Sequence, residues 1–401
     1  MPQGVRGFVG SRLTEARLVR GITSNRALAD LLGRAPSTVG RWEDGTSAPE
    51  PAALGEISAA LRLPEAFFLE KRFAQGSGIF FRSFSAALKS SRALQAGRVM
   101  WLSDVATVAE HYAHLPESDL PDLLEGRSYR EMRHEDIEAA AKALRTHWGL
   151  GSRPIENMVD LLERRGVIVA SEQMDTDKLD GLGTWIGGRA FVLLASDKAS
   201  YARRQFDAAH ELAHLVLHRG ADEQAIATDL KLIEQQANSF ASAFLLPADQ
   251  YPLEVQSIDL YELERLKVRW KVSIKAQIYR LKTLDVLGNE GAASLFKRYS
   301  AKGYSRGEPY DDGAWPLQQP SLLADVFREI VNQGVLTKAE LLQEFCLSSH
   351  DIEALSGLPV GWLTQETARV IDLKPRTAGP GNPNEHGNVV RLDRRLSTKQ
   401  E

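Results

Sequence analysis

The chain has 401 residues, of which 43% are hydrophobic and 25% are charged, and this length predicts two or three domains that each bury a core. A net charge of −4 excludes a general polycation, so any contact with nucleic acid has to come from a local surface. The single cysteine, Cys346, excludes an internal disulfide and a cysteine-rich zinc site, and it favours a reducing, cytoplasmic environment.

The N-terminal residues precede a predicted bundle of short helices. Residues 1–6 lack the apolar segment of a signal peptide, and no apolar run in the chain is long enough to cross a bilayer. Within residues 8–72, Ser24 is a typical N-cap for a helix over 25–32, Gly33 follows its end, and Pro36 suits the first turn of the next helix. Two short helices around such a turn form a helix-turn-helix, whose second helix can lie in the major groove of DNA.

This region resembles the lambda-repressor-like XRE family of DNA-binding domains. The residues that carry the resemblance are Leu28-Ala29, Leu32-Gly33, Ser37-Thr38-Val39, Arg41-Trp42-Glu43 and Gly45. The resemblance implies that Ser37, Thr38 and Arg41 contact bases or phosphates of the DNA. It also implies that Asn25 contacts the DNA backbone. The chain departs from the family pattern at Arg34, Ala35 and Pro36. The alternative is a helical bundle that serves protein contacts.

Residues 73–130 are expected to form a linker and a connecting helix. The run at 75–91 is rich in Gly, Ser and Phe and predicts a linker that docks by its aromatic side chains, followed by an amphipathic helix over 92–114. A further helix is predicted over 134–148, and Pro154 and Gly166 bound another over 155–165. Short strands then follow at 167–170, 183–186 and 190–194, with Gly187-Gly188 as a tight turn, which predicts a small antiparallel sheet.

The stretch from Arg203 to His218 contains the pattern His-Glu-x-x-His. Because residues four apart share one face of a helix, His210 and His214 point at a common spot and can bind Zn²⁺ through neutral imidazoles. Glu211, one step around the helix, can reach a water on the metal without ligating it, and so act as a general base. Without a third ligand, ordinary core histidines remain an equal alternative.

A third ligand is available on the next predicted helix, over 232–247. Glu234 lies beside its buried stripe and completes a His₂Glu site with one position open to water. Asn238, one turn later, can orient a ligand from outside the coordination sphere, with a surface amide as the alternative. Asp229 is a rival ligand where the chain enters the helix. His218 continues the histidine stripe, but it is expected to pack or to support a ligand, because a further turn is about 6 Å along the axis.

These residues resemble the ImmA/IrrE family of zinc metallopeptidases. The resemblance covers roughly the middle third of the chain and is carried by these segments: Gly149-Leu150, Gly166, Phe206 to His218, Glu234, Ala237-Asn238, Phe240-Ala241 and Leu245-Leu246-Pro247. It implies that the two histidines and the downstream glutamate bind one Zn²⁺ per chain, that the motif glutamate is the catalytic base, and that the substrates are DNA-binding repressors. Mn²⁺ or Fe²⁺ can also occupy a His₂Glu site.

The remainder of the chain contains no recognisable chemistry. Helices are predicted over 260–270 and 273–284, whose dense Lys and Arg residues favour a solvated face over a second nucleic-acid surface, and further helices are predicted over 321–373. A run rich in Gly, Pro and Asn predicts a disordered tail. The expected divisions are 8–72 (helix-turn-helix), 73–130 (linker and connecting helix), 131–250 (metallopeptidase), 251–374 (helical region) and 375–401 (tail).

Together these patterns predict an α+β protein that is predominantly α. The leading hypothesis is a DNA-binding transcriptional regulator fused to a zinc endopeptidase that cleaves a repressor or a related protein. The alternative hypothesis is a non-cleaving repressor or antitoxin-like regulator, whose peptidase-like region senses a ligand or a partner. The expected partners are operator DNA, a protein substrate and a second copy of the chain in a homodimer, with no membrane. An open sheet edge beside the metal would let a substrate strand pair there.

Overall fold

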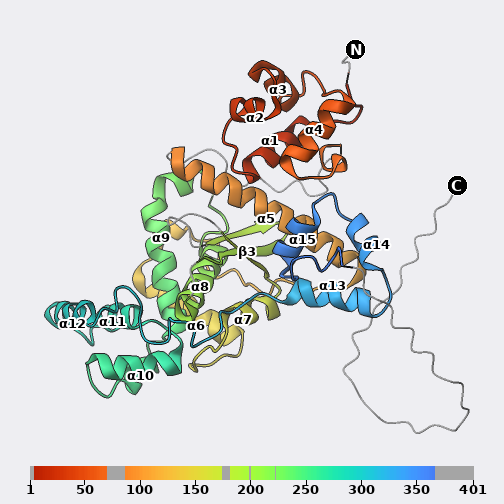
Figure 1. The fold of residues 1–401 in the computed structure, drawn as a ribbon. Helices are drawn as coiled ribbons and strands as arrows, with labels where there is room; N and C mark the ends of the chain where they lie inside the picture. Colours follow the sequence, from red (N-terminus) through yellow and green to blue (C-terminus); the bar gives the residue numbers. More distant parts are fainter. Residues whose placement is uncertain (1–3, 70–85, 174–180, 198–199, 222, 366–401) are drawn as a thin grey trace, which may run out of the picture.

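The computed structural model describes residues 4–69, 86–173, 181–197, 200–221 and 223–365, which are predominantly helical around one small sheet (Figure 1). The first helices are α1 (Gly10–Val19), α2 (Asn25–Leu32), α3 (Pro36–Glu43), α4 (Pro51–Leu61), α5 (Ala86–Tyr112), α6 (His134–His147) and α7 (Met158–Arg164). The others are α8 (Tyr201–Leu217), α9 (Glu223–Leu245), α10 (Leu260–Trp270), α11 (Ile274–Thr283), α12 (Asn289–Ala301), α13 (Leu322–Asn332), α14 (Lys338–Gln343) and α15 (Ser349–Ser356). None of these described helices is long and apolar enough to cross a membrane.

Most of the aromatic linker expected at 75–91 and the whole tail expected at 375–401 lie outside the described residues. The helix predicted over 92–114 begins earlier in the structure, at Ala86.

The N-terminal helices form where their local signals place them. The Ser24 side chain accepts a hydrogen bond of 3.1 Å from the Ala27 amide and caps α2. Gly33 ends α2 in the left-handed region, with φ of 62°, a conformation that glycine adopts without steric cost. Pro36 occupies the first turn of α3, where its missing N–H is not needed. The predicted helices α2 and α3 are therefore confirmed.

One helix starts later than Pro154 predicts. The helix α7 begins at Met158, because the Asn157 side chain accepts from the Asp160 amide at 3.1 Å and caps it there. Residues 155–157 are not helical, and the side-chain amide of Gln205 donates to the Ile155 carbonyl. The predicted start at residue 155 is wrong because a polar side chain beyond the proline provides the cap.

The sheet is mixed rather than antiparallel. Its strands are β1 (Ile168–Glu172), β2 (Gly181–Ile186) and β3 (Arg189–Ala195), in the order β1-β3-β2. The Gly187-Gly188 turn makes β2 and β3 antiparallel, as predicted, with Ile186 opposite Arg189. β1 pairs with the other edge of β3, in parallel. The expectation of a wholly antiparallel sheet is therefore wrong for β1.

The central strand β3 is buried on both faces. Phe191, Leu193 and Ala195 pack into one hydrophobic core with α5, and Ala190, Val192 and Leu194 pack into a second core with α8 and α9. This double burial explains why the strand is a continuous apolar run rather than an alternating one. In Figure 1, α5 crosses one face of the sheet and α8 lies on the other.

The C-terminal helices divide between these two cores. The helices α10–α12 pack with the core of α8 and α9, whereas α13–α15 return to α5 and β1, as Figure 1 shows. At this return, Asp351 of α15 is 1% exposed and accepts hydrogen bonds from Arg20, which follows α1, and from Arg98 of α5, both at 2.6 Å. Arg98 also forms a salt bridge with Glu172 at the end of β1. This buried network joins the N-terminal helices, the sheet and the C-terminal helices.

Candidate metal centre

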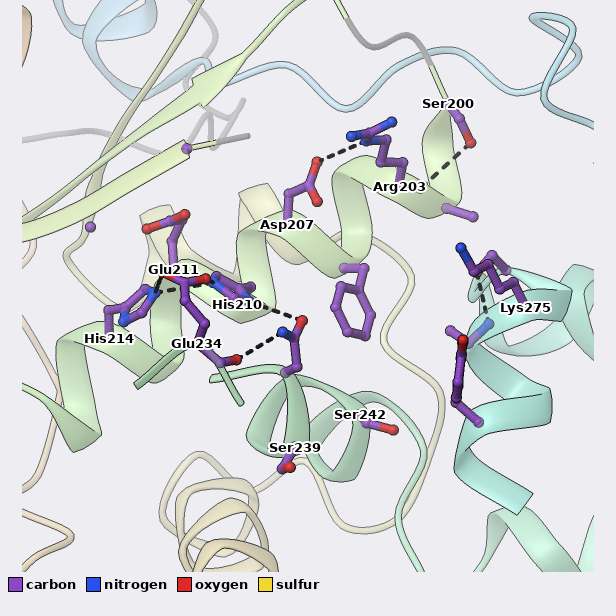
Figure 2. A pocket seen from close by; sticks show the side chains of 18 of the residues that line it. Ser200, Arg203, Asp207, His210, Glu211, His214, Glu234, Ser239, Ser242 and Lys275 are labelled. Carbon is purple, nitrogen blue, oxygen red and sulfur yellow. Dashed lines mark hydrogen bonds and ion pairs between the residues drawn. The ribbon is translucent and has the colours of Figure 1, made fainter. Parts of the chain in front are cut away.

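The helix α8 presents two imidazoles to a cavity. Its apolar side chains are buried against the sheet and α9, while His210 and His214 are only partly buried and line the cavity wall. Their Nε2 atoms lie 3.0 Å apart, one helical turn from each other (Figure 2). The predicted convergence of these histidines is present in the structure.

Glu234 of α9 completes a cluster of three donor residues. Its Oε2 atom is 3.3 Å from Nε2 of His210, and its Oε1 atom is 4.0 Å from Nε2 of His214. The rival carboxylate is directed elsewhere, because Asp229 accepts from the Tyr129 hydroxyl at 2.7 Å and forms an ion pair of 2.5 Å with Arg130. Glu234 is therefore the carboxylate that reaches both imidazoles (Figure 2).

The three donors fit a divalent metal. Their ligand atoms all lie within 4.8 Å of one another. Tetrahedral zinc with bonds of about 2.0–2.1 Å sets neighbouring donor atoms about 3.3 Å apart, which is close to the separations seen here. Two imidazole nitrogens and a carboxylate oxygen at these separations can share one cation, either a proton or a metal ion. Burial lowers the pKa of His210, but the hydrogen bond and charge of Glu234 and the charges of other carboxylates outweigh it and raise this pKa to about 9, so the site favours positive charge.

Asn238 contacts the ring of His210 on the side away from the cluster. Its Nδ2 donates to the backbone carbonyl of Glu234 at 2.8 Å, so its Oδ1 is left to accept from Nδ1 of His210, at 3.3 Å. A histidine protonated on Nδ1 has its Nε2 lone pair free. The contact predicted for Asn238 thus has the polarity that a metal-binding His210 requires.

His218 lies behind His214 and outside the donor cluster. It is 6% exposed, and its Nδ1 is 3.0 Å from Nδ1 of His214, while its Nε2 is 3.0 Å from Oε1 of Gln236. Burial lowers the pKa of His218 to about 4. The expectation that this histidine supports a ligand agrees with its position. Gln236 was not singled out, because a glutamine in a helix carries no motif.

Glu211 is buried beside the cluster, under strand β2. It is 5% exposed, and burial raises its pKa to about 7, with His210 opposing the shift and Glu234 adding to it. A Cβ atom at Gly181 would lie 2.7 Å from Oε1 of Glu211, and one at Gly183 would lie 2.8 Å from its backbone oxygen. The two glycines thus let the strand pass close enough to enclose this carboxylate.

Strand β2 is the edge of the sheet at the cavity. Residues 181–185 all line the cavity wall, and β3 covers only the inner side of β2. In an antiparallel pair, alternate residues direct their N–H groups outward, and the Gly183 amide donates to Glu211 on that outer side. The predicted sheet edge beside the donor cluster is therefore present, with Gly183 already engaged by a side chain.

The cavity has a volume of about 2220 Å³ and extends from the donor cluster to the C-terminal helices. Its far wall is formed by α11, the end of α12 and residues 302–312, with Lys275 on the opposite side from the histidines in Figure 2. Pockets for small molecules have volumes of roughly 300–1,000 Å³, so this cavity is large enough for a segment of polypeptide.

Buried charges fix the far wall in place. Lys267 has no exposed surface, and its Nζ lies 3.0 Å from Glu308 and 2.8 Å from Asp311. Glu308 also accepts from the Ile274 amide at 2.7 Å and from the Tyr299 hydroxyl at 3.0 Å. Because the buried lysine is paired and the acceptors are satisfied, residues 308–311 are held against α10 and α11. The cavity is thus built into the fold.

The predicted DNA contacts lie apart from this site, on the N-terminal helices. Ser37 and Arg41 are exposed one turn apart on α3, and Thr38 is partly exposed. Asn25, at the start of α2, lies beside Gly40 of α3. None of these four residues lines the cavity, and α2 and α3 lie at the far end of the molecule in Figure 1.

The middle of the chain is similar to a known peptidase family. Residues 162–282 match the family model described as the IrrE N-terminal-like domain. The match runs from the end of α7 through α11 and includes His210, Glu211, His214 and Glu234. It supports the ImmA/IrrE resemblance and a metallopeptidase-type region, for which zinc is the typical metal. No curated protein matches the chain.

Proposed function

We propose that this chain is a zinc-dependent endopeptidase that cleaves a regulatory protein, joined to N-terminal helices that bind operator DNA. The observation that carries the peptidase part is the convergence of His210, His214 and Glu234 beside the buried Glu211, on the wall of a cavity that can accept polypeptide. This combination supplies a metal site, a base and room for a peptide bond in one place.

The roles of the residues follow from their positions. His210, His214 and Glu234 would hold the ion, and Asn238 would orient His210. Bound zinc supplies a Lewis acid that polarises the scissile carbonyl and increases the acidity of water in the site. Glu211 accepts a proton from the attacking water as its oxygen forms a bond to the carbonyl carbon. Glu211 then gives this proton to the leaving amine nitrogen, and the peptide C–N bond breaks.

The substrate is proposed to be a DNA-binding repressor or a related regulatory protein. The size of the cavity supports a polypeptide substrate, and the family resemblance supports a repressor. The edge of β2 would pair with an extended segment beside the site, using backbone groups other than the Gly183 amide.

The N-terminal helices are proposed to bind DNA through α3. Ser37, Thr38 and Arg41 offer hydrogen-bond donors on its accessible side, and Asn25 lies next to this helix. This placement, together with the resemblance to the XRE family, supports a local DNA-binding surface on a chain whose net charge is negative.

The experiment that tests the proposed peptidase replaces Glu211 by Gln. The probe substrates are purified DNA-binding repressors encoded beside this gene, incubated with the zinc-loaded full chain. Glu211→Gln should retain zinc and lose cleavage by at least about 100-fold, because general-base catalysis contributes roughly 10²–10⁴-fold. Glu135→Gln, at an exposed position of α6, is the matched control and should cleave normally. Unchanged cleavage by Glu211→Gln would refute the role of this residue.

A second candidate function is a regulator that does not cleave. It is favoured by the network in which Asp351 binds both Arg20, at the end of α1, and Arg98 of α5, and Arg98 binds Glu172 of β1. The network joins the sheet, whose strand β2 lines the cavity, to the N-terminal helices, so a ligand in the cavity would act on these helices through the sheet. If Glu211→Gln regulates its promoter as well as the parent chain, binding alone accounts for the function.

A further inference from the structure

His218 uses both of its ring nitrogens, although it is not part of the donor cluster. Its Nδ1 faces Nδ1 of His214 at 3.0 Å, and its Nε2 faces Oε1 of Gln236 at 3.0 Å. The ring is 6% exposed and packs edge-on against Tyr129, with ring centroids 5.6 Å apart. Because Nδ1 of His218 faces the back of the His214 ring, His218 is not placed as a fourth ligand.

The direction of these hydrogen bonds is set by a backbone carbonyl. The carbonyl oxygen of Tyr129 can only accept, and Nε2 of Gln236 donates to it at 2.7 Å. The amide oxygen of Gln236 is therefore the atom that faces His218, and it too can only accept. Nε2 of His218 must consequently carry the proton of this contact.

The same reasoning continues to the metal ligand. A neutral His218 that is protonated on Nε2 has a lone pair on Nδ1, which accepts a proton from Nδ1 of His214. The His214 ring then has a lone pair on Nε2, the atom that faces His210 and Glu234. If His218 instead donated from Nδ1, His214 would be protonated on Nε2 and could not bind a metal.

We propose that Gln236 and His218 are positioning residues, which hold His214 in the tautomer and orientation that bind the metal. The inference rests on the proposed metal site. Neither residue contacts the ion. The orientation of His214 depends, through these two side chains, on the backbone carbonyl of Tyr129. The Asn238 contact does the same for His210 from the backbone of Glu234, so both imidazoles are directed through side-chain amides of α9.

Two measurements on the full chain test this proposal. The first uses ¹⁵N-labelled histidine and long-range ¹⁵N–¹H NMR, on metal-free and zinc-loaded protein, to identify the protonated nitrogen of each ring. We expect His218 to be protonated on Nε2 alone in both forms, and His214 to be protonated on Nδ1 alone when zinc is bound. A His218 ring protonated on Nδ1 in the zinc-loaded protein would overturn the proposal, without any substitution that can disturb folding.

The second measurement is zinc affinity, by competition with a chromophoric chelator. His218→Leu removes the acceptor and should weaken zinc binding about 10–100-fold, the usual effect of losing a partner of a ligand. His218→Gln supplies an acceptor oxygen again and should recover most of this loss. His147→Leu, at an exposed position on α6, is the control for a histidine substitution outside the site. Melting of each metal-free variant shows whether it folds.

The outcomes separate this inference from the proposed function. A parent chain that binds zinc tightly and a His218→Leu variant that binds it equally well would overturn the positioning role alone. A parent chain that binds no zinc would overturn the metal site and this inference together. Weaker binding by His218→Leu with recovery in His218→Gln supports the role, because a purely structural loss would not depend on an acceptor atom.

Discussion

The Nε2 atoms of His210 and His214 face each other at 3.0 Å, and the opposite nitrogen of each ring contacts a second side chain of the fold. Contacts within the fold therefore direct both rings at one point. Preorganisation of this kind reduces the cost of ordering the ligands, so that more of the binding energy appears as affinity.

Metal removal is expected to destabilise the folded chain. An ion that binds only the native state stabilises it by about 2.7 kcal/mol when its free concentration is 100 times Kd. Adding a chelator should therefore lower the melting temperature measured by calorimetry, and adding Zn²⁺ should restore it. Glu234→Ala should lack this zinc-dependent shift, whereas Gln235→Ala, at the exposed neighbouring position, should retain it. A zinc-dependent shift of full size in Glu234→Ala would argue against this ligand.

The glycine at 183 is expected to be necessary for the enclosure of Glu211. In Gly183→Ala the new Cβ would lie 2.8 Å from the backbone oxygen of Glu211, which cannot move away as a flexible side chain can. Overpacking of this kind costs about 1–3 kcal/mol, so we expect a lower free energy of unfolding and slower cleavage. Zinc content should stay normal, because none of the three ligands lies on β2. The measurements are urea unfolding, peptidase assays and metal analysis.

Gly220→Ala is the control for Gly183→Ala, because a Cβ there meets no atom within 4 Å and the residue is exposed. It should not lower the free energy of unfolding. Equal behaviour of the two variants would show that the close approach of β2 to α8 does not matter.

Asp351 is expected to make the stability of the chain depend on pH. Burial alone would raise its pKa, but the hydrogen bond from Arg20 and the charges of Arg98 and Arg20 lower it to about 2. A carboxylate whose pKa is lower in the folded state stabilises the protein above its unfolded pKa, which is about 3.9. This stabilisation is lost as the pH falls from about 4 to 2, and it amounts to about 2 kcal/mol.

The free energy of unfolding should accordingly be lower in Asp351→Asn than in the parent at pH 7, and the difference should shrink toward pH 3. Asp325→Asn is the matched control, since this aspartate is 62% exposed in its pair with Arg328 and such pairs contribute about 0–1 kcal/mol. A difference for Asp351→Asn that stays constant between pH 7 and pH 3 would contradict the assigned network.

The proposed DNA surface predicts a specific change in salt dependence. Arg41→Ala, on the exposed side of α3, should weaken binding to operator DNA by about 1–3 kcal/mol if the side chain reads a base. If it contacts a phosphate instead, the loss should be similar for all sequences, and the slope of log K against log salt should fall by about 1. Fluorescence anisotropy at several salt concentrations distinguishes these results. Arg164→Ala, exposed on α7, is the control and should bind as the parent does.

The sequence was informative at several places where local contacts decide the structure, although the local cap that starts α7 at Met158 was missed. Ser24, Gly33 and Pro36 define α2 and α3 through caps and turns that involve near neighbours. The spacing of His210 and His214 is likewise a property of one helix, so their convergence could be predicted. Glu234 could be predicted as well, because it follows on the next helix and belongs to the same resemblance.

Long-range packing explains what could not be predicted. The parallel pairing of β1 with β3 is a contact between strands that are not consecutive in the sequence, and no local signal in β1 indicates it. The return of α13–α15 to α5 depends on Asp351 meeting Arg20 and Arg98, residues more than 250 positions away. Gln236 carries no motif, and its position between the Tyr129 carbonyl and His218 emerges only in three dimensions.

X-ray absorption at the zinc K-edge of the zinc-loaded full chain tests the metal centre most directly. The account predicts a first shell of nitrogen and oxygen atoms at about 2.0–2.1 Å with the outer-shell scattering of two imidazoles. The Glu234→Ala variant should lose one oxygen from this shell or lose the ion altogether. A spectrum with no imidazole scattering, or one that is identical in the parent and Glu234→Ala, would contradict the claim that these three side chains hold the ion.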